Sequence, residues 1–214
     1  MPSETARATA PRRRLTAARR RRQLIDVALE TFARTGYTAT TMEDIATAAG
    51  VTKPLLYQHF ASKRALYLEL IDDVTARLIE VLGAAALTET NFRRRVEAGM
   101  LAYFTFTVEN PSAIRMLYDA PPDEELARGL RSIQDAIADF VSPLIEADID
   151  DQHRRTLAVA VVGMTEGVTR QWLRQRQVRG VATEDEAAEK EAVLVAERVA
   201  DFAWSGLRGA RRIG

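Results

Sequence analysis

The chain has 214 residues, with 30 Lys or Arg, 30 Asp or Glu, two His and no Cys. This length is enough for a small domain joined to a larger one, and an apolar share of 47% is enough for a buried core. The lack of Cys excludes disulfides, thiolate zinc sites and a cysteine nucleophile. No apolar run approaches the roughly 20 residues of a membrane span, and no apolar segment of a secretory signal follows the arginine-rich start. We expect a cytoplasmic protein without membrane contact.

The balanced net charge hides an uneven distribution along the chain. Residues 1–64 carry 12 Lys or Arg against five Asp or Glu, whereas residues 65–214 carry 18 against 25. Within the first part, residues 1–22 hold eight Arg and one Glu. This excess predicts a polyanionic partner for the N-terminal part, although a solvated tail that aids solubility is the alternative. Residues 1–16 contain two Pro and no apolar periodicity, so we expect a disordered basic arm.

Four helices are predicted after this arm. Ile25, Ala28, Leu29 and Phe32 recur at the spacing of one buried helical stripe, and Gly36 is a typical helix end. A second helix is expected to end at Gly50, and a third carries a proline in its first turn, where a missing N–H is harmless. A fourth extends to about residue 82. The expected N-caps of the last three helices are Thr40 or Thr41, Thr52 and Ser62.

Residues 41–60, TMEDIATAAGVTKPLLYQHF, have the pattern of a helix-turn-helix. Two helices that cross steeply need a small residue where they touch, which is Ala46, and a turn residue that tolerates positive φ, which is Gly50. Apolar side chains on both helices, such as Ile45 and Leu56, would fix the crossing. Together with a helix before and a helix after, this spacing predicts a DNA-binding unit.

The remaining chain continues in helical patterns without strand signals. Helices are expected over 91–109, to about 118, over 123–141 and over 151–179, and a capping box at Thr183 and Glu186 begins a last helix to about Leu207. The sequence thus predicts an all-α protein of about nine helices: a basic arm (1–16), a three-helix DNA-binding domain (17–64), a larger helical domain for ligand binding and dimerisation (65–209) and a tail (210–214).

The segment from about residue 20 to residue 70 closely resembles the DNA-binding domain of TetR-family transcriptional regulators. The resemblance rests on TGYTATTMEDIATAAGVTKPLLYQHFASKRALYLEL, residues 35–70. It implies a homodimer that binds double-stranded DNA at a palindromic operator through its third helix, and a small-molecule effector bound by the middle helices. It also implies DNA contacts by Thr41, Thr52, Lys53, Pro54, Leu55, Tyr57, Gln58, His59 and Lys63.

These residue types suit DNA, but several have structural alternatives. Lys53 and Gln58 can contact base edges or phosphates, whereas Tyr57 and His59 are phosphate donors or partly buried packing residues. Lys63 resembles a phosphate clamp of the family. Pro54 and Leu55 either shape the helix or touch a thymine methyl, and Thr41 is first of all a cap. The arginines of the arm either reach DNA or form a loosely held tail.

An aromatic and methionine cluster in the middle helices is the expected effector site. Such a stripe is often ordinary core, and only the resemblance to the family favours a pocket for a hydrophobic small molecule. Tyr103, Tyr118 and Glu166 are its polar candidates. The expected ligand-binding residues are Met100, Tyr103, Phe104, Met116, Leu117, Tyr118, Phe140, Met164 and Trp172.

The last two helices are the expected dimer interface. Gly163 and Gly167 form a G-x-x-x-G that lets another backbone approach, either within the chain or from a second copy. No motif for catalysis, a metal or a cofactor is present. The sequence therefore predicts a non-enzymatic transcriptional regulator, a repressor released from DNA by its ligand. The alternatives are a ligand-independent regulator or an activator of the same fold, or a helical adaptor or enzyme that binds a small molecule.

Overall fold

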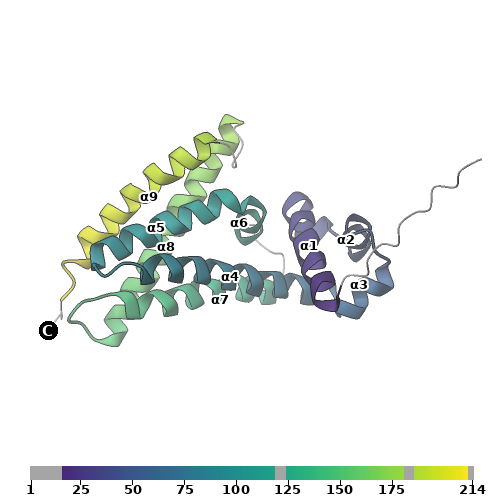
Figure 1. Ribbon diagram of the computed structural model, residues 1–214, viewed down its shortest axis with the longest axis horizontal. Coiled ribbons are helices and arrows are strands. Elements are labelled where there is room, and N and C mark those ends of the chain that lie inside the picture. Colours follow the sequence, from purple (N-terminus) through teal and green to yellow (C-terminus); the bar gives the residue numbers. More distant parts are fainter. Residues whose placement is uncertain (1–15, 119–123, 181–185, 212–214) are drawn as a thin grey trace, which may run out of the picture.

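The computed structural model describes residues 16–118, 124–180 and 186–211, which form helices and contain no strand. The expected all-helical class is confirmed, with a helix-turn-helix domain at one end and a larger helical domain beside it (Figure 1). The expected arm, apart from Thr16, and the capping residue Thr183 lie outside the described residues. The elements are α1 (Ala17–Ala39), α2 (Met42–Ala48), α3 (Lys53–His59), α4 (Lys63–Leu87), α5 (Phe92–Glu109), α6 (Pro111–Tyr118), α7 (Glu124–Val141), the short 3-10 helix η1 (Ser142–Leu144), α8 (Asp151–Arg179) and α9 (Glu186–Leu207).

Local signals set the ends of the short helices. Thr41 and Asp44 form a reciprocal capping box at the start of α2, with Asp44 N donating to Thr41 Oγ1 at 3.1 Å and Thr41 N donating to the Asp44 carboxylate at 2.8 Å. Gly36 interrupts α1 at φ 77°, and Gly50 forms the turn after α2 at φ 63°. The expected side-chain cap at Thr52 is wrong, because its hydroxyl makes no capping hydrogen bond.

Helix α4 is longer than the sequence pattern predicts. It continues through Gly83 to Leu87 and does not end near residue 82. A single internal glycine costs only about 1 kcal/mol relative to alanine, and the burial of Leu82 and Ala86 on either side outweighs that cost. A Cβ at position 83 would lie 3.5 Å from the Phe140 ring, so the glycine lets α7 approach closely.

Helix α4 also connects the two domains, because it crosses the expected boundary after residue 64. Its Tyr67 ring packs edge-on against Phe32 and Tyr37 of α1, with ring centroids 5.1 and 4.9 Å apart. The Tyr67 hydroxyl donates to the carbonyl of Met116 in α6, at 3.4 Å. One continuous apolar core therefore extends from the DNA-binding domain into the larger domain.

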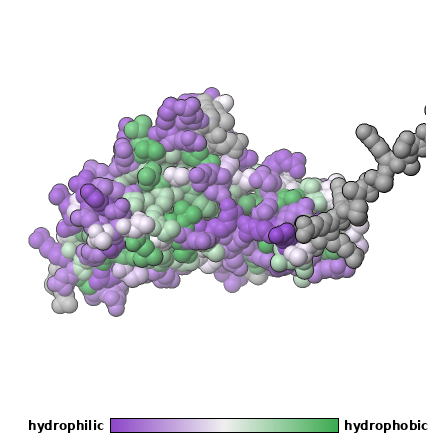
Figure 2. All heavy atoms as spheres, in the orientation of Figure 1, coloured by the Kyte–Doolittle hydropathy of each residue, from purple (hydrophilic) through white to green (hydrophobic). Residues whose placement is uncertain are grey.

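Helix α9 packs mainly against α5, where the Phe92 and Trp204 rings meet edge-on at 5.4 Å. It touches α8 mainly around Glu191, whose carboxylate accepts from Trp172 Nε1 at 3.0 Å. The outer faces of α8 and α9 stay open to solvent, and Figure 2 shows apolar residues among the polar ones in this part of the molecule. No described helix is long and apolar enough to cross a membrane.

Candidate nucleic-acid interface and ligand cavity

Helix α3 presents a polar face to solvent. Leu56 is fully buried against the domain core, whereas Lys53, Pro54, Tyr57 and Gln58 are exposed, with 45% of the Tyr57 side chain open to solvent. The exposed positions recur at intervals of three and four, so they share one side of the helix. This side carries an ammonium, a phenol and an amide, which are donors suited to base edges and phosphates.

Helix α1 fixes the C-terminal end of α3. Arg21 donates to the His59 carbonyl at 2.8 Å and its guanidinium lies 4.6 Å from the centroid of the Phe60 ring. Its other nitrogen forms an ion pair with Glu69 of α4 at 2.5 Å. A single arginine thus joins α1, α3 and α4, which holds the exposed face of α3 in a fixed orientation.

Lys63 lies at the corner between α1 and α2. Its ammonium donates to the carbonyls of Tyr37 at 2.9 Å and Thr40 at 2.8 Å and lies 4.4 Å from the centroid of the Tyr37 ring. These bonds give the expected phosphate clamp a structural task in the protein without DNA. Its contact with phosphate stays a prediction.

The other expected DNA contacts differ in exposure. Thr41 and Thr52 are exposed, the first as part of the capping box, whereas Leu55 and His59 are half-buried. Lys53 faces Glu43 of α2 at 3.5 Å, an exposed pair that DNA can replace at little cost. All of these residues except the half-buried pair surround the open side of α3.

Two of the N-terminal arginines expected to contact DNA are engaged inside the protein. Arg21 holds α3, as described, and Arg22 forms ion pairs with Asp26 of its own helix, at 3.2 Å, and with Asp73 of α4. Arg19 is exposed and Arg20 donates to Gln23 at 2.9 Å. Within the described part of the arm, Arg19 and Arg20 are therefore best placed for a partner outside the chain.

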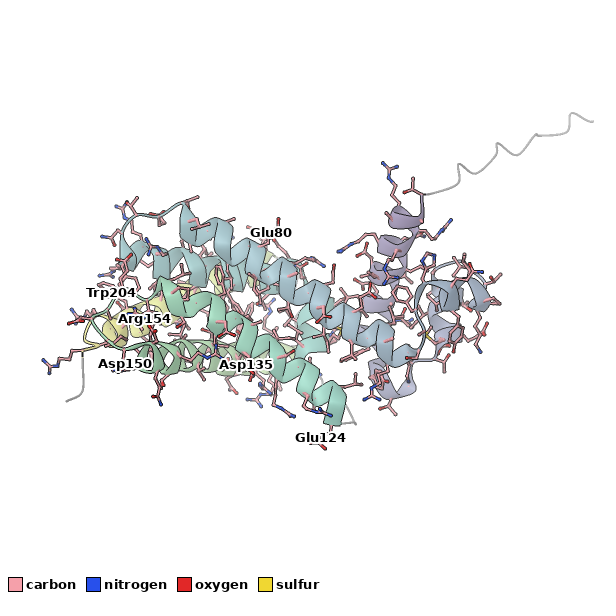
Figure 3. All side chains as sticks on the ribbon, turned by 90° about the horizontal axis from the view of Figure 1, so that it is seen from below. Glu80, Glu124, Asp135, Asp150, Arg154 and Trp204 are labelled. Atoms are coloured by element: carbon pink, nitrogen blue, oxygen red, sulfur yellow. The ribbon has the colours of Figure 1, made fainter. Side chains whose placement is uncertain are left out.

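A cavity of about 200 Å³ lies between α4, α5, α7 and α8 in the larger domain. Figure 3 shows α7 alongside α4, with Glu124 at the end nearest α1 and Asp150 and Arg154 at the opposite end. Most of the wall is aliphatic or aromatic. Of the expected ligand-binding residues, Met100, Tyr103, Leu117 and Phe140 line this cavity.

The remaining expected ligand residues do not line it. Phe104 is fully buried and packs edge-on against Trp172 at 6.3 Å, and the Trp172 indole is held by Glu191. Met116 is buried near α1, with its carbonyl accepting from Tyr67, and Met164 packs at the edge of the core. These side chains belong to the core of the free protein. The side chain of Tyr118 lies outside the described residues.

The cavity also contains polar groups. Gln134 of α7 donates to the Glu166 carboxylate of α8 at 2.5 Å, and both residues line the cavity together with Arg131 and Arg170. Burial raises the pKa of the Glu166 carboxyl, an effect opposed by the bond from Gln134 and by the Arg170 charge. At the opposite end Arg95 forms an ion pair with Glu146 at 2.6 Å.

The helix-turn-helix segment matches a known family. Residues 24–70 match the family described as "Bacterial regulatory proteins, tetR family". Over 198 residues, 91% of this chain and 85% of the relative, the chain is 32% identical to the HTH-type transcriptional activator FasR of Mycolicibacterium smegmatis. The chain belongs to the TetR family of transcriptional regulators. It is therefore a DNA-binding regulator and not an enzyme, as the sequence predicts.

Solved structures of TetR-like regulators share the whole fold. A TetR-like transcriptional regulator from Rhodococcus sp. RHA1 superposes with a TM-score of 0.70 at 26% identity, covering 92% of this chain and all of that one. The regulator FadR from Bacillus subtilis, in complex with stearoyl-CoA, superposes with a TM-score of 0.69 at 17% identity, covering 86% of this chain and 98% of FadR. The second likeness concerns the fold alone.

Sequence reasoning missed the polar rim of this TetR-family cavity. Arg131, Gln134 and Arg170 have the spacing of a solvated helix face, so the pattern gave no reason to assign them to a ligand site. Glu166 was the one member of the cluster that the sequence singled out. An expected contact between α7 and α8 would have been the signal that joins these residues.

Proposed function

We propose that the chain is a homodimeric repressor that acts in the cytoplasm, binds a palindromic operator and leaves it when a hydrophobic small molecule enters the cavity. The observation that carries this proposal is the position of the cavity against α4. Leu78 and Leu82 of this helix line the cavity, and Tyr67, nearer its start, packs against the helix-turn-helix domain. A ligand that displaces α4 would therefore change the orientation of the DNA-binding domain.

Binding to two half-sites is supported by the outer faces of α8 and α9. Gly163 and Gly167 are exposed, and a Cβ at either position would meet nothing within 4 Å. Close packing within the chain therefore does not explain this G-x-x-x-G. Val159 is 50% exposed on the same side of α8, and Leu194 and Phe202 are 50% and 71% exposed on α9. A second copy of the chain would cover these surfaces and place two α3 helices on one DNA.

A second route from the cavity to the DNA-binding domain passes through α6. Leu117 of α6 lines the cavity, and Ser112 of the same helix donates to Glu30 of α1 at 2.9 Å. A ligand affects DNA binding only through a difference in its affinity for the two conformations, so a hundredfold loss of DNA affinity needs about 2.7 kcal/mol of coupling.

The direction of regulation has a second candidate. FasR is named a transcriptional activator, and its likeness spans most of both chains, which favours an activator as the alternative to a repressor. The same bound dimer blocks or recruits RNA polymerase according to where its operator lies. Deletion of the gene separates the two: target transcripts rise if the chain is a repressor and fall if it is an activator.

Ligand control is tested on the DNA upstream of the chain's own gene. Compounds that raise the melting temperature of the protein are added to the protein–DNA complex, and the fluorescence anisotropy of labelled DNA is followed. The proposal expects at least one such compound to weaken DNA binding strongly, with DNA weakening the binding of that compound by the same factor. A ligand-independent regulator would bind this DNA equally tightly with every stabilising compound, and a helical adaptor or enzyme would not bind it.

A further inference from the structure

The cavity opens at one place, and the side chains there are polar. Among the described residues that line it, the exposed ones are Arg131 and Gln134 of α7 and Arg170 of α8. The wall behind them contains buried aliphatic side chains such as Ile133, Ile137 and Val162. The cavity is therefore an apolar chamber with a polar mouth between α7 and α8.

The two arginines lie on the same side of this mouth. The bond from Gln134 to Glu166 joins α7 to α8, and Arg155 pairs with Asp135 at 3.0 Å farther along, so the two helices run antiparallel. Arg131 precedes Gln134 by one turn, and Arg170 follows Glu166 by one turn. In antiparallel helices these two steps point in the same direction, which brings both guanidinium groups to one end of the bridge.

The charge at the mouth favours an anion. Arg131 and Arg170 contribute two positive charges against the single carboxylate of Glu166, whose hydrogen bond from Gln134 already satisfies one oxygen. Arg95, at the opposite end of the cavity, is neutralised by Glu146. A guanidinium binds a carboxylate or phosphate through paired N–H donors, so an anionic group of the ligand would be held at the mouth and not at the far end.

The shape of the chamber favours a long apolar tail. Its lining residues on α5 extend from Phe92 to Tyr103, roughly 16 Å along a helix axis. Gly99 lies between them and lines the cavity, and a Cβ at this position would meet nothing within 4 Å. The glycine keeps the chamber wide at its middle, although glycine is unfavourable inside a helix.

We infer that the cavity binds an amphiphile with an unbranched alkyl chain and an anionic head, and that Arg131 and Arg170 hold the head at the mouth. This inference rests on the proposed function and specifies its ligand class. A free fatty acid and an acyl thioester that carries phosphates share this chemistry. Because both arginines are exposed, each contributes modestly, with about a fivefold loss of affinity expected on its removal.

Titration calorimetry with three probes of equal chain length tests the head group: dodecanoate, dodecanoyl-coenzyme A and the neutral dodecanol, each below its micellar concentration. Both anions should bind at least about tenfold more tightly than the alcohol at low salt, and added salt should narrow the difference. R131A and R170A should weaken the anions about fivefold each and leave the alcohol unchanged. The matched controls R128A and R174A remove exposed arginines of the same helices that do not line the cavity, and they should change nothing.

The relative affinities of the two anions identify the source of the head, because a phosphate-bearing head predicts the larger salt dependence for the thioester. Gly99→Leu, which fills the open space beside α5, should abolish binding of all three probes. If the acid and the alcohol bind equally, and R131A and R170A match their controls, the inference is overturned, while loss of both ligands in Gly99→Leu would still support an apolar effector in this cavity. If none of the three probes binds the wild-type chain, the inference is overturned outright, and the anisotropy experiment above then decides the proposed function by itself.

Discussion

The guanidinium of Arg22 in α1 is bonded to the carboxylate of Asp73 in α4, so the first helix of the DNA-binding domain is attached to the helix that lines the cavity. Arg77, one turn farther along α4, faces the same carboxylate at 3.8 Å and bonds to the side chain of Asn110 between α5 and α6. Charges thus connect α1, α4 and the start of α6 along the outside of the domain junction. This chain of contacts is a physical route by which a ligand would affect α1.

Replacement of Asp73 by alanine should weaken the effect of ligand on DNA affinity, because the attachment of α1 to α4 is lost. We expect a loss of stability of about 1 kcal/mol, since Arg22 is 46% exposed and the pair is partly screened by solvent. Asp26→Ala is the matched control, because it removes the pair of Arg22 within α1 and leaves the contact with α4 intact. A double-mutant cycle of Arg22→Ala and Asp73→Ala, with ligand-induced release of DNA as the readout, measures the coupling. Equal effects of Asp26→Ala and Asp73→Ala would contradict this role.

Substitutions on the exposed side of α3 should separate specificity from general affinity. Gln58→Ala and Lys53→Ala should each cost about 1–3 kcal/mol on the preferred operator and relax the preference at one base pair, if these side chains contact base edges. Tyr57→Phe keeps the ring and removes the phenol, so it should weaken binding to all sequences alike. Binding to a panel of operator variants measures both effects. Gln152→Ala, an exposed change at the start of α8, is the control, and a specificity profile identical to wild type in all three α3 variants would place the DNA elsewhere.

Charge on the open face of α9 should prevent dimer formation. Phe202→Glu places a carboxylate in a surface that a second copy is proposed to bury, where an unpaired charge is strongly unfavourable. Sedimentation velocity should then show monomers, and operator affinity should fall because each monomer binds one half-site. Leu87→Glu is the matched control, since Leu87 is an exposed apolar residue, 80% exposed, at the end of α4. A dimer that persists in Phe202→Glu at micromolar concentration would exclude this interface.

Glu166 should make stability depend on pH. Burial raises the pKa of this carboxyl above 4.5, its ordinary value, so the folded chain holds the proton more tightly than the unfolded chain. The free energy of unfolding should therefore fall as pH rises from about 4.5 through the raised pKa, and the penalty is fully present above it. Gln134, Arg131 and Arg170 are the polar neighbours at the mouth. Glu166→Gln should remove this dependence and stabilise the neutral-pH protein by a few tenths of a kcal/mol, because solvent screens the partly exposed group. Denaturant titrations across this pH range measure it, and an unchanged pH slope in the variant would count against burial of Glu166 as the cause.

The helix-turn-helix was predictable because its determinants are local. Ala46 at the crossing, Gly50 in the turn and the Thr41 cap lie within ten residues of one another, and each has one physical task that other parts of the chain do not alter. Lys63 shows the limit. Its bonds reach across more than twenty residues to the α1–α2 corner, so the sequence pattern gave its place beside the DNA-binding helix but not its partners.

The cavity was only partly predictable, because an apolar stripe has the same spacing whether it faces a void or a neighbouring helix. Tyr103 and Phe104 are adjacent in α5, yet the first lines the cavity and the second packs against Trp172. The difference depends on how α8 and α9 cross α5, and these crossings follow from contacts far apart in the sequence. Glycine misled in the opposite direction, since Gly83 permits the contact with Phe140 and does not end a helix.

A symmetric dimer that binds DNA through α3 is tested most directly by footprinting the wild-type chain on the DNA upstream of its own gene. We predict protection of two inverted half-sites whose centres are separated by one helical turn, about 34–36 Å, or a multiple of it, with an even number of chains bound at saturation. Protection of a single asymmetric half-site by one chain, or a footprint that Lys53→Ala and Tyr57→Ala leave unchanged, would contradict it.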